Sequence, residues 1–91
     1  MNNEIGSFEI SNLSDEQLIV LRQLTFVAQD GFDDSSHYWK NKAEKLEDAE
    51  LVEDARQYAK EELVRANQCS VLQNRLREEQ RKRQARYEAE L

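Results

Sequence analysis

The clearest pattern in the chain lies between residues 51 and 76, where apolar or small side chains recur in alternating steps of four and three. Such spacing places these side chains on one side of a helix and is typical of a coiled-coil seam. Two charged residues occupy slots in the middle of the seam, and small residues beside it widen the buried face. The sequence therefore predicts a long helix that self-associates through Leu51, Ala55, Tyr58, Glu62, Arg65, Cys69, Leu72 and Leu76.

An earlier and more apolar segment predicts another helix, which begins at Ser14. Ser14 and Gln17 have the spacing of a capping box, and the two acidic residues between them favour the positive end of a helix dipole. Gly31 is expected to end this helix in a left-handed conformation, near residue 30. A helix with so few polar positions needs cover on most sides. Its apolar residues are Leu18, Ile19, Val20, Leu21, Leu24, Phe26, Val27 and Ala28.

Four consecutive N-cap candidates follow this glycine, so a short turn is expected there and a second helix is expected to begin around Ser36. Its first apolar face, at Trp39, Ala43 and Leu46, is out of phase with the later seam. The helix therefore either breaks near Asp48 or continues and buries two faces in turn. The lack of glycine and proline favours continuity. The tryptophan is expected to anchor the second helix against the first.

The composition agrees with an all-α fold, because 38% of residues are hydrophobic and 35% are charged, with two glycines and no proline. We expect a helical hairpin over residues 14–76, in which a short apolar helix folds back on a long C-terminal helix. The core of so small a domain is completed by self-association, most simply as a homodimer. Glu62 and Arg65 lie one turn apart, so they pair within the chain or across two antiparallel chains and set the register.

The two ends of the chain are expected to differ in character. Residues 1–13 form an N-terminal arm that carries Ile5 and Phe8 and is either laid over a hydrophobic groove or loosely ordered. Residues 77–91 lose large apolar side chains and form a charged, solvated helix end. Glu79 and Arg83 have the favourable four-residue spacing of an ion pair there.

Charge is distributed unevenly along the chain, whose formal net charge is −6. Residues 1–54 contain thirteen acidic and four basic residues, whereas residues 55–91 contain six acidic and nine basic residues. An acidic face of this kind either keeps a protein soluble or attracts a basic groove on another protein, even as a decoy for nucleic acid. The partner-binding candidates on this face are Glu44, Glu47, Asp48, Glu50, Glu53 and Asp54.

One cationic cluster near the C-terminal end offers an alternative function. A helix with several bases close together can lie along a nucleic-acid backbone and release its counterions. Two acids lie within the cluster, and bases in the last turns also stabilise the negative end of a helix dipole. The candidate nucleic-acid-binding residues are Arg75, Arg77, Arg81, Lys82, Arg83 and Arg86.

The residues that usually carry catalysis are scarce. Cys69 is the only cysteine and lies inside the seam, and His37 is the only histidine. No glycine-rich phosphate loop or nucleophile elbow is present, and Glu62 is the one acid on the seam. The sequence therefore predicts a protein that is not an enzyme, with no cofactor and no metal site.

The early residues lack the basic start and apolar core of a signal peptide, and no apolar run approaches membrane-spanning length. We therefore expect a cytoplasmic protein with no membrane partner. The function that fits best is a regulatory protein–protein interaction module, such as a small adaptor or a phage-type inhibitor. Its partners would be a second copy of itself and another protein. No motif assigns the chain to a known family.

Overall fold

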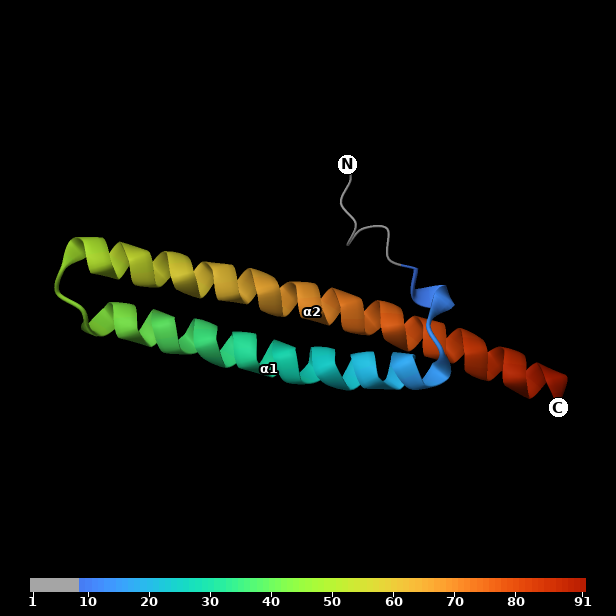
Figure 1. Cartoon of the computed structure of the whole chain (residues 1–91). Coiled ribbons are helices and arrows are strands. Elements are labelled where there is room, and N and C mark those ends of the chain that lie inside the picture. Colours follow the sequence, from blue (N-terminus) through green and yellow to red (C-terminus); the bar gives the residue numbers. More distant parts are fainter. Residues whose placement is uncertain (1–8) are drawn as a thin grey trace.

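The computed structural model describes residues 9–91, which form an antiparallel helical hairpin (Figure 1). A short 3-10 helix, η2 (Ile10–Asn12), precedes the long helices α1 (Asp15–Lys45) and α2 (Ala49–Glu90). The predicted all-α hairpin is confirmed, and none of residues 9–91 belongs to a β-strand. The two long helices lie side by side along most of their length, so nearly all packing within the chain is helix on helix.

The start of α1 follows the sequence prediction. The Ser14 hydroxyl accepts a hydrogen bond from the Gln17 amide at 3.1 Å, and the Gln17 side chain accepts one from the Ser14 amide at 2.9 Å. Asp15 and Glu16 occupy the first turn, where their negative charge complements the helix dipole. The reciprocal capping box therefore fixes where α1 begins.

The predicted end of the first helix at Gly31 is wrong, as are the turn after it and a second helix starting at Ser36. Helix α1 passes through both residues and ends at Lys45. Gly31 does not adopt a positive φ, so it is an ordinary helical residue. The apolar pattern continues through the glycine, because Phe32 and Trp39 follow the buried Thr25 at seven-residue steps, both are partly buried, and Trp39 packs on Tyr58 of α2.

The chain reverses instead at residues 46–48, and the preference for a continuous helix through Asp48 is therefore wrong as well. Asp48 is the N-cap of α2, and its carboxylate accepts hydrogen bonds from the amides of Glu50 at 2.9 Å and Leu51 at 3.1 Å. The change of phase between the two apolar patterns reflects this reversal. The expected short first helix is also wrong, because α1 has 31 residues against 42 in α2.

The core is concentrated where η2 meets the hairpin. Ile10, Leu18 and Leu76 form the buried cluster, and Leu13 and Leu72 are among the partly buried residues packed against it. Towards the loop, small side chains allow the helices to approach closely; they are Ala43, Ala55, Ala59 and Ala66. The predicted arm is therefore seen packed from residue 10 onward, while Ile5 and Phe8 lie outside the described residues.

Aromatic and polar contacts hold the rest of the hairpin together. The Trp39 ring lies 5.2 Å from the Tyr58 ring of α2, between centroids, so the tryptophan anchors α1 to α2. The Ser36 hydroxyl donates to the Ala59 carbonyl at 2.8 Å, and the Ser35 hydroxyl donates to Glu62 at 3.4 Å. The sequence-based role of Trp39 as an anchor holds, but its helix and its partner differ from those expected.

Candidate interaction surface

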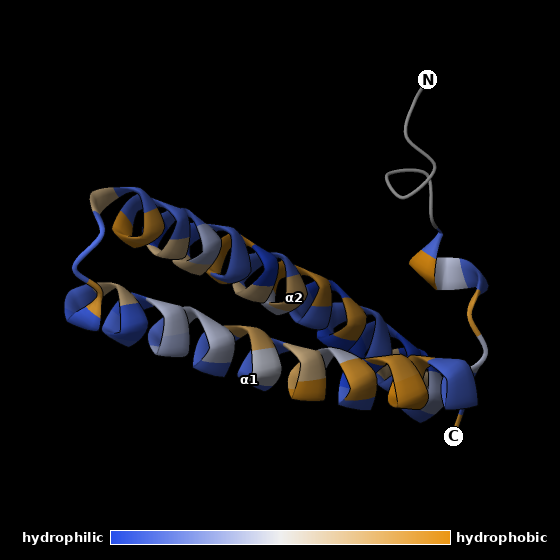
Figure 2. Ribbon diagram, turned by 60° about the vertical axis from the view of Figure 1, so that its left-hand side comes forward, coloured by the Kyte–Doolittle hydropathy of each residue, from blue (hydrophilic) through white to orange (hydrophobic). Residues whose placement is uncertain are grey.

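The most apolar part of α1 remains largely outside the hairpin core. Figure 2 shows that the hydrophobic bands of α1 gather towards its N-terminal half. Between 46% and 69% of the accessible surface is exposed for five large side chains, which we name the α1 apolar surface: Ile19, Val20, Leu24, Phe26 and Val27. Exposed apolar side chains are normal when scattered singly, but a contiguous group of them marks an interaction site.

The side of α1 that faces α2 is more polar than this outer surface. Thr25 is buried there, and its hydroxyl donates to the carbonyls of Leu21 at 2.9 Å and Arg22 at 3.0 Å. The Arg22 guanidinium donates to the Gln80 side chain of α2, and Gln73 is also buried between the helices. The first half of α1 therefore buries polar groups beside Leu18 while it leaves large apolar side chains exposed, which a self-sufficient hairpin would avoid.

The same region contains a shallow groove between the helices. Ile19, Phe26 and Val27 border it from α1, and Gln73 and Gln80 border it from α2. The α1 wall also includes Arg22 and Gln23, so the groove combines three large apolar side chains with polar groups from both helices. Such a surface suits the side of another helix, whose apolar side chains would cover the isoleucine and the phenylalanine.

The residues of the predicted α2 seam fall into two groups, because some lie in the hairpin contact and others face solvent. Ala55 and Leu76 are buried, whereas Glu62, Cys69 and Leu72 are partly buried. The exposed members of the seam are Leu51, Tyr58 and Arg65. Self-association through this seam stays a prediction, while its buried members are already covered within the chain.

The charged pair in the middle of the seam forms within one chain. The Arg65 guanidinium lies 3.2 Å from the Glu62 carboxylate, one turn earlier on α2. Arg65 is half exposed, with 49% of its side-chain surface accessible. The ion pair with an arginine so exposed contributes little to stability, and it is the Ser35 hydrogen bond to Glu62 that joins this position to α1.

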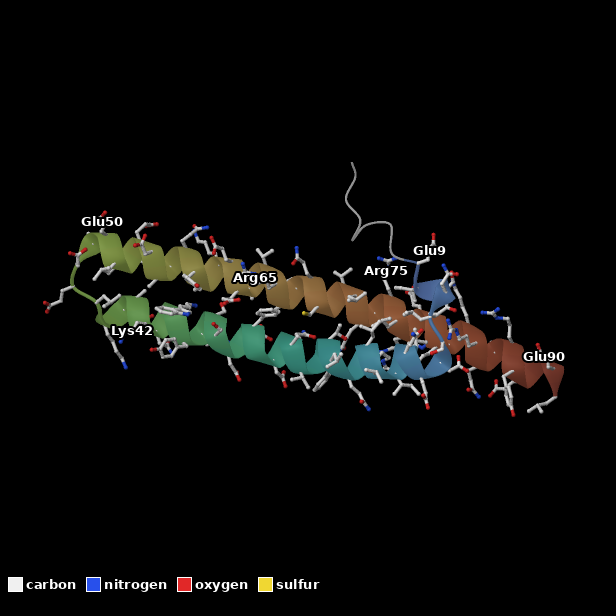
Figure 3. The ribbon with its side chains drawn as sticks, viewed as in Figure 1. Glu9, Lys42, Glu50, Arg65, Arg75 and Glu90 are labelled. Atoms are coloured by element: carbon white, nitrogen blue, oxygen red, sulfur yellow. The ribbon has the colours of Figure 1, made fainter. Side chains whose placement is uncertain are left out.

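The predicted acidic face lies around the loop between the helices. Figure 3 shows Lys42 near the end of α1 and Glu50 near the start of α2, on the two sides of this loop. One acidic residue there has a structural task, because the Asp48 carboxylate caps α2. All the predicted residues are exposed, namely Glu44, Glu47, Asp48, Glu50, Glu53 and Asp54.

The predicted basic cluster does not form a single basic face. Helical spacing places Arg77 and Arg81 on one side of α2, and Arg75, Lys82 and Arg86 on another side, which they share with Glu79. Arg86 lies 3.8 Å from Glu79. The larger of these two groups therefore contains an acid, which weakens its attraction for a nucleic-acid backbone.

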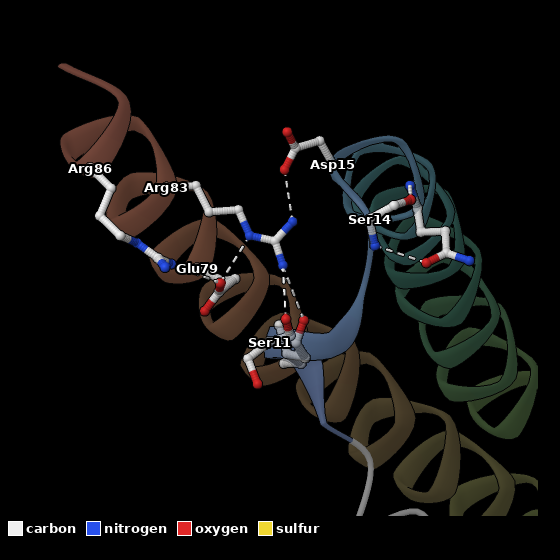
Figure 4. A network of polar contacts seen from close by, with 8 residues as sticks. Ser11, Ser14, Asp15, Glu79, Arg83 and Arg86 are labelled. Atoms are coloured by element: carbon white, nitrogen blue, oxygen red, sulfur yellow. Dashed lines mark hydrogen bonds and ion pairs between the residues drawn. The ribbon is translucent and has the colours of Figure 1, made fainter. Parts of the chain in front are cut away.

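Arg83 is the best-connected of these bases, and it binds η2 and α1 to α2 (Figure 4). Its guanidinium donates to Glu79 at 2.9 Å and to Asp15 at 2.8 Å. It also reaches the carbonyls of Ile10 at 3.5 Å and Ser11 at 3.4 Å. The expected pair with Glu79 is therefore confirmed as part of a larger network.

The hydrogen bonds that Arg83 donates to Asp15 and then to Glu79 raise the pKa of its guanidinium. A raised pKa in the folded state means that the contribution to stability is present below the unfolded pKa and is lost only as the pH rises through the folded value. The guanidinium is therefore charged throughout neutral and moderately alkaline solution. Its network does not act as a pH switch from the arginine side.

Replacing Arg83 by glutamine should loosen η2 without unfolding the long helices. The amides of Asn12 and Leu13, which donate to Glu9 and Ile10 at 3.1 Å, should then exchange with solvent severalfold faster. Hydrogen exchange followed by NMR measures this directly, with the exposed Arg81→Gln as the matched control. Equal exchange in both variants would show that Arg83 does not hold η2 in place.

Within residues 9–91, no three His, Cys, Asp or Glu side chains gather as a group that could hold a metal ion. Neither long helix contains a stretch that is long and apolar enough to cross a membrane. Comparison with protein-family models, curated proteins and solved structures finds no match to this chain. The interaction surface must therefore be interpreted from its own residues.

Proposed function

We propose that the protein is a non-catalytic protein–protein interaction module that works through the α1 apolar surface and self-associates. One observation carries this proposal. Five large apolar side chains, from Ile19 to Val27, stand 46–69% exposed on one helix, while Thr25 and Gln73 are buried in the hairpin contact. Covering these side chains would remove apolar surface from water, and each Å² buried stabilises the complex by about 25 cal/mol.

The single-chain core is small enough for this association to matter. Among residues 9–91, only Leu18 and Leu76 are large side chains with almost no exposure. A hairpin with so few buried large residues gains stability when another surface covers its apolar helix. Regulation by binding, as an adaptor or an inhibitor, needs no residue beyond such a surface. A cytoplasmic location stays a prediction.

The two alternatives drawn from charge receive less support. The other bases of the C-terminal end are divided between two sides of α2, and Arg83 is engaged by Asp15 and Glu79. The acidic residues beside the loop are exposed, which suits solubility as well as binding. Nucleic-acid binding and nucleic-acid mimicry stay predictions, and the apolar surface is the feature on which we base the function.

Photo-crosslinking tests this function without knowledge of the partner. We expect benzophenone-alanine placed at Phe26 to give covalent adducts in cells, either with the protein itself or with another protein, because Phe26 is 59% exposed on the proposed surface. The same group at Tyr87, which is 62% exposed at the far end of α2, is the matched control and should give none.

Adducts at Phe26 must also disappear when Leu24 and Val27 are replaced by glutamate, since the charges would keep the surface in water. If position 26 gives no adduct, or if positions 26 and 87 give the same adducts, the proposed function fails.

A further inference from the structure

A second seam runs along the outer side of α1. Val20, Leu24, Val27 and Gly31 follow one another in steps of four, three and four. This is the spacing of a coiled-coil contact, and it lies away from the side on which Leu18 is buried against α2. The three large members are 51%, 59% and 69% exposed, so the hairpin leaves more than half of each side chain uncovered. Helix α1 is therefore built to pack on both sides.

Gly31 is the member of this outer seam that the hairpin itself does not explain. It is helical without a positive φ, and a Cβ atom at this position would meet nothing within 4 Å. Neither a turn nor close packing within the chain therefore calls for glycine, and glycine weakens an exposed helix relative to alanine. On an outer seam, however, a missing side chain lets another helix approach closely.

We propose that the occupant of this outer seam is a second copy of the chain, docked with its α1 antiparallel to the first. This inference rests on the proposed function and names the partner and its orientation. In this arrangement Val20 packs against the partner's Gly31, and Leu24 packs against the partner's Val27. A large residue thus meets the glycine, and the same contacts repeat through the two-fold axis.

Charge selects the antiparallel orientation. Continuing the seam by one step at each end places Asp34 beside the partner's Gln17, which avoids contact between like charges. Along the edge of the seam, Glu16 lies near the partner's His37, and Asp30 lies near the partner's Gln23. A parallel pair would instead place Asp34 against the partner's Asp34, which is unfavourable.

The resulting assembly is a four-helix arrangement with the two α1 helices in the middle. Each α1 would then contact α2 of its own chain on one side and α1 of the partner on the other. This explains why the most apolar segment of the chain lies on α1, since only that helix is covered twice. It also leaves α2, with its exposed charges, on the outside.

Disulfide trapping tests the orientation, in a Cys69→Ser background that removes the native thiol. We expect Val20→Cys and Gly31→Cys to form a disulfide with each other when the two variants are mixed, and neither to form one alone. In the antiparallel pair two copies of residue 20 are about 16 Å apart along the axis, because eleven residues at 1.5 Å each separate positions 20 and 31. A disulfide needs Cβ atoms within about 4.5 Å.

Disulfides of Val20→Cys with itself would establish a parallel pair and overturn the proposal. The absence of any disulfide would do the same. If no disulfide formed but mass measurements still gave a dimer, only the antiparallel geometry would fail. Loss of all crosslinked adducts at Phe26 would contradict the proposed function as well.

Gly31→Ala provides a second test that does not depend on new thiols. Alanine strengthens the helix of the single chain but separates the two α1 backbones, so the dissociation constant of the dimer should rise about tenfold. Lys40→Ala, at an exposed position of α1 outside the seam, is the control and should leave the constant unchanged. Equal or tighter association of Gly31→Ala would contradict the close approach.

Discussion

Replacing Leu76 by alanine should lower the free energy of unfolding by about 2–5 kcal/mol, which is the usual range for a buried leucine. Leu76 is fully buried at 0% exposure and contacts the cluster of Ile10 and Leu18, so alanine would leave a cavity where η2, α1 and α2 meet. A domain of this size has a total stability of about 5–15 kcal/mol. The single change should therefore remove a large share of the stability.

Urea unfolding followed by circular dichroism measures this loss, at one fixed protein concentration because association contributes to stability. Leu51→Ala, on the same helix but 53% exposed, is the matched control and should change the free energy by about 0.5 kcal/mol or less. Similar losses at Leu51 and Leu76 would mean that the core does not lie at the η2 end of the hairpin.

Replacing Leu24 and Val27 together by glutamate should raise the dissociation constant of the dimer more than about 100-fold. Two charges would have to leave water in the centre of the proposed contact, and those of the two copies would face each other. The helical content should stay the same, because both side chains are more than half exposed in the single chain. Sedimentation velocity over a dilution series measures the effect.

A second double variant separates this surface from general charge effects. Val64 and Val71 are 54% and 60% exposed on α2 and are seven residues apart, so they share one outer face. Changing both to glutamate adds the same charge to the other helix and should leave association unchanged. If this control also dissociates the dimer, or if it alone does so, the contact is not on α1.

The start of the hairpin could be predicted from the sequence, because the capping box of Ser14 and Gln17 is a local feature. The position of the reversal could not be obtained from glycine. Gly31 lies in open space within the helix and does not end it. The seven-residue repeat of Thr25, Phe32 and Trp39 continues through this position. Asp48 was the available signal, since an N-cap residue preceded a change in the phase of the apolar pattern.

The predicted seam on α2 differs from the observed hairpin contact by a small rotation of the helix. Ala59 and Ala66 face α1 and are buried, whereas their larger neighbours Tyr58 and Arg65 are exposed. Close packing of two helices favours small residues, so these two alanines form the contact itself and do not merely widen the seam. The spacing gave the correct period, but side-chain size decided which residues face inward.

The outer surface of α1 could be inferred only in part. Its apolar content indicated that cover on most sides was needed, yet the uncovered side depends on which residues α2 occupies. Thr25 is buried because its hydroxyl bonds to carbonyls of its own helix, and Arg22 is accommodated by Gln80. These contacts let polar groups share the inward side of α1 with Leu18 and leave large apolar side chains on its outer side.

Sedimentation equilibrium of the wild-type protein shows whether the α1 apolar surface joins two copies of this chain. Over the micromolar range, we expect a mass that rises with concentration to twice the 10.7 kDa of one chain. A mass that stays at 10.7 kDa throughout that range, with unfolding that does not depend on protein concentration, would contradict it.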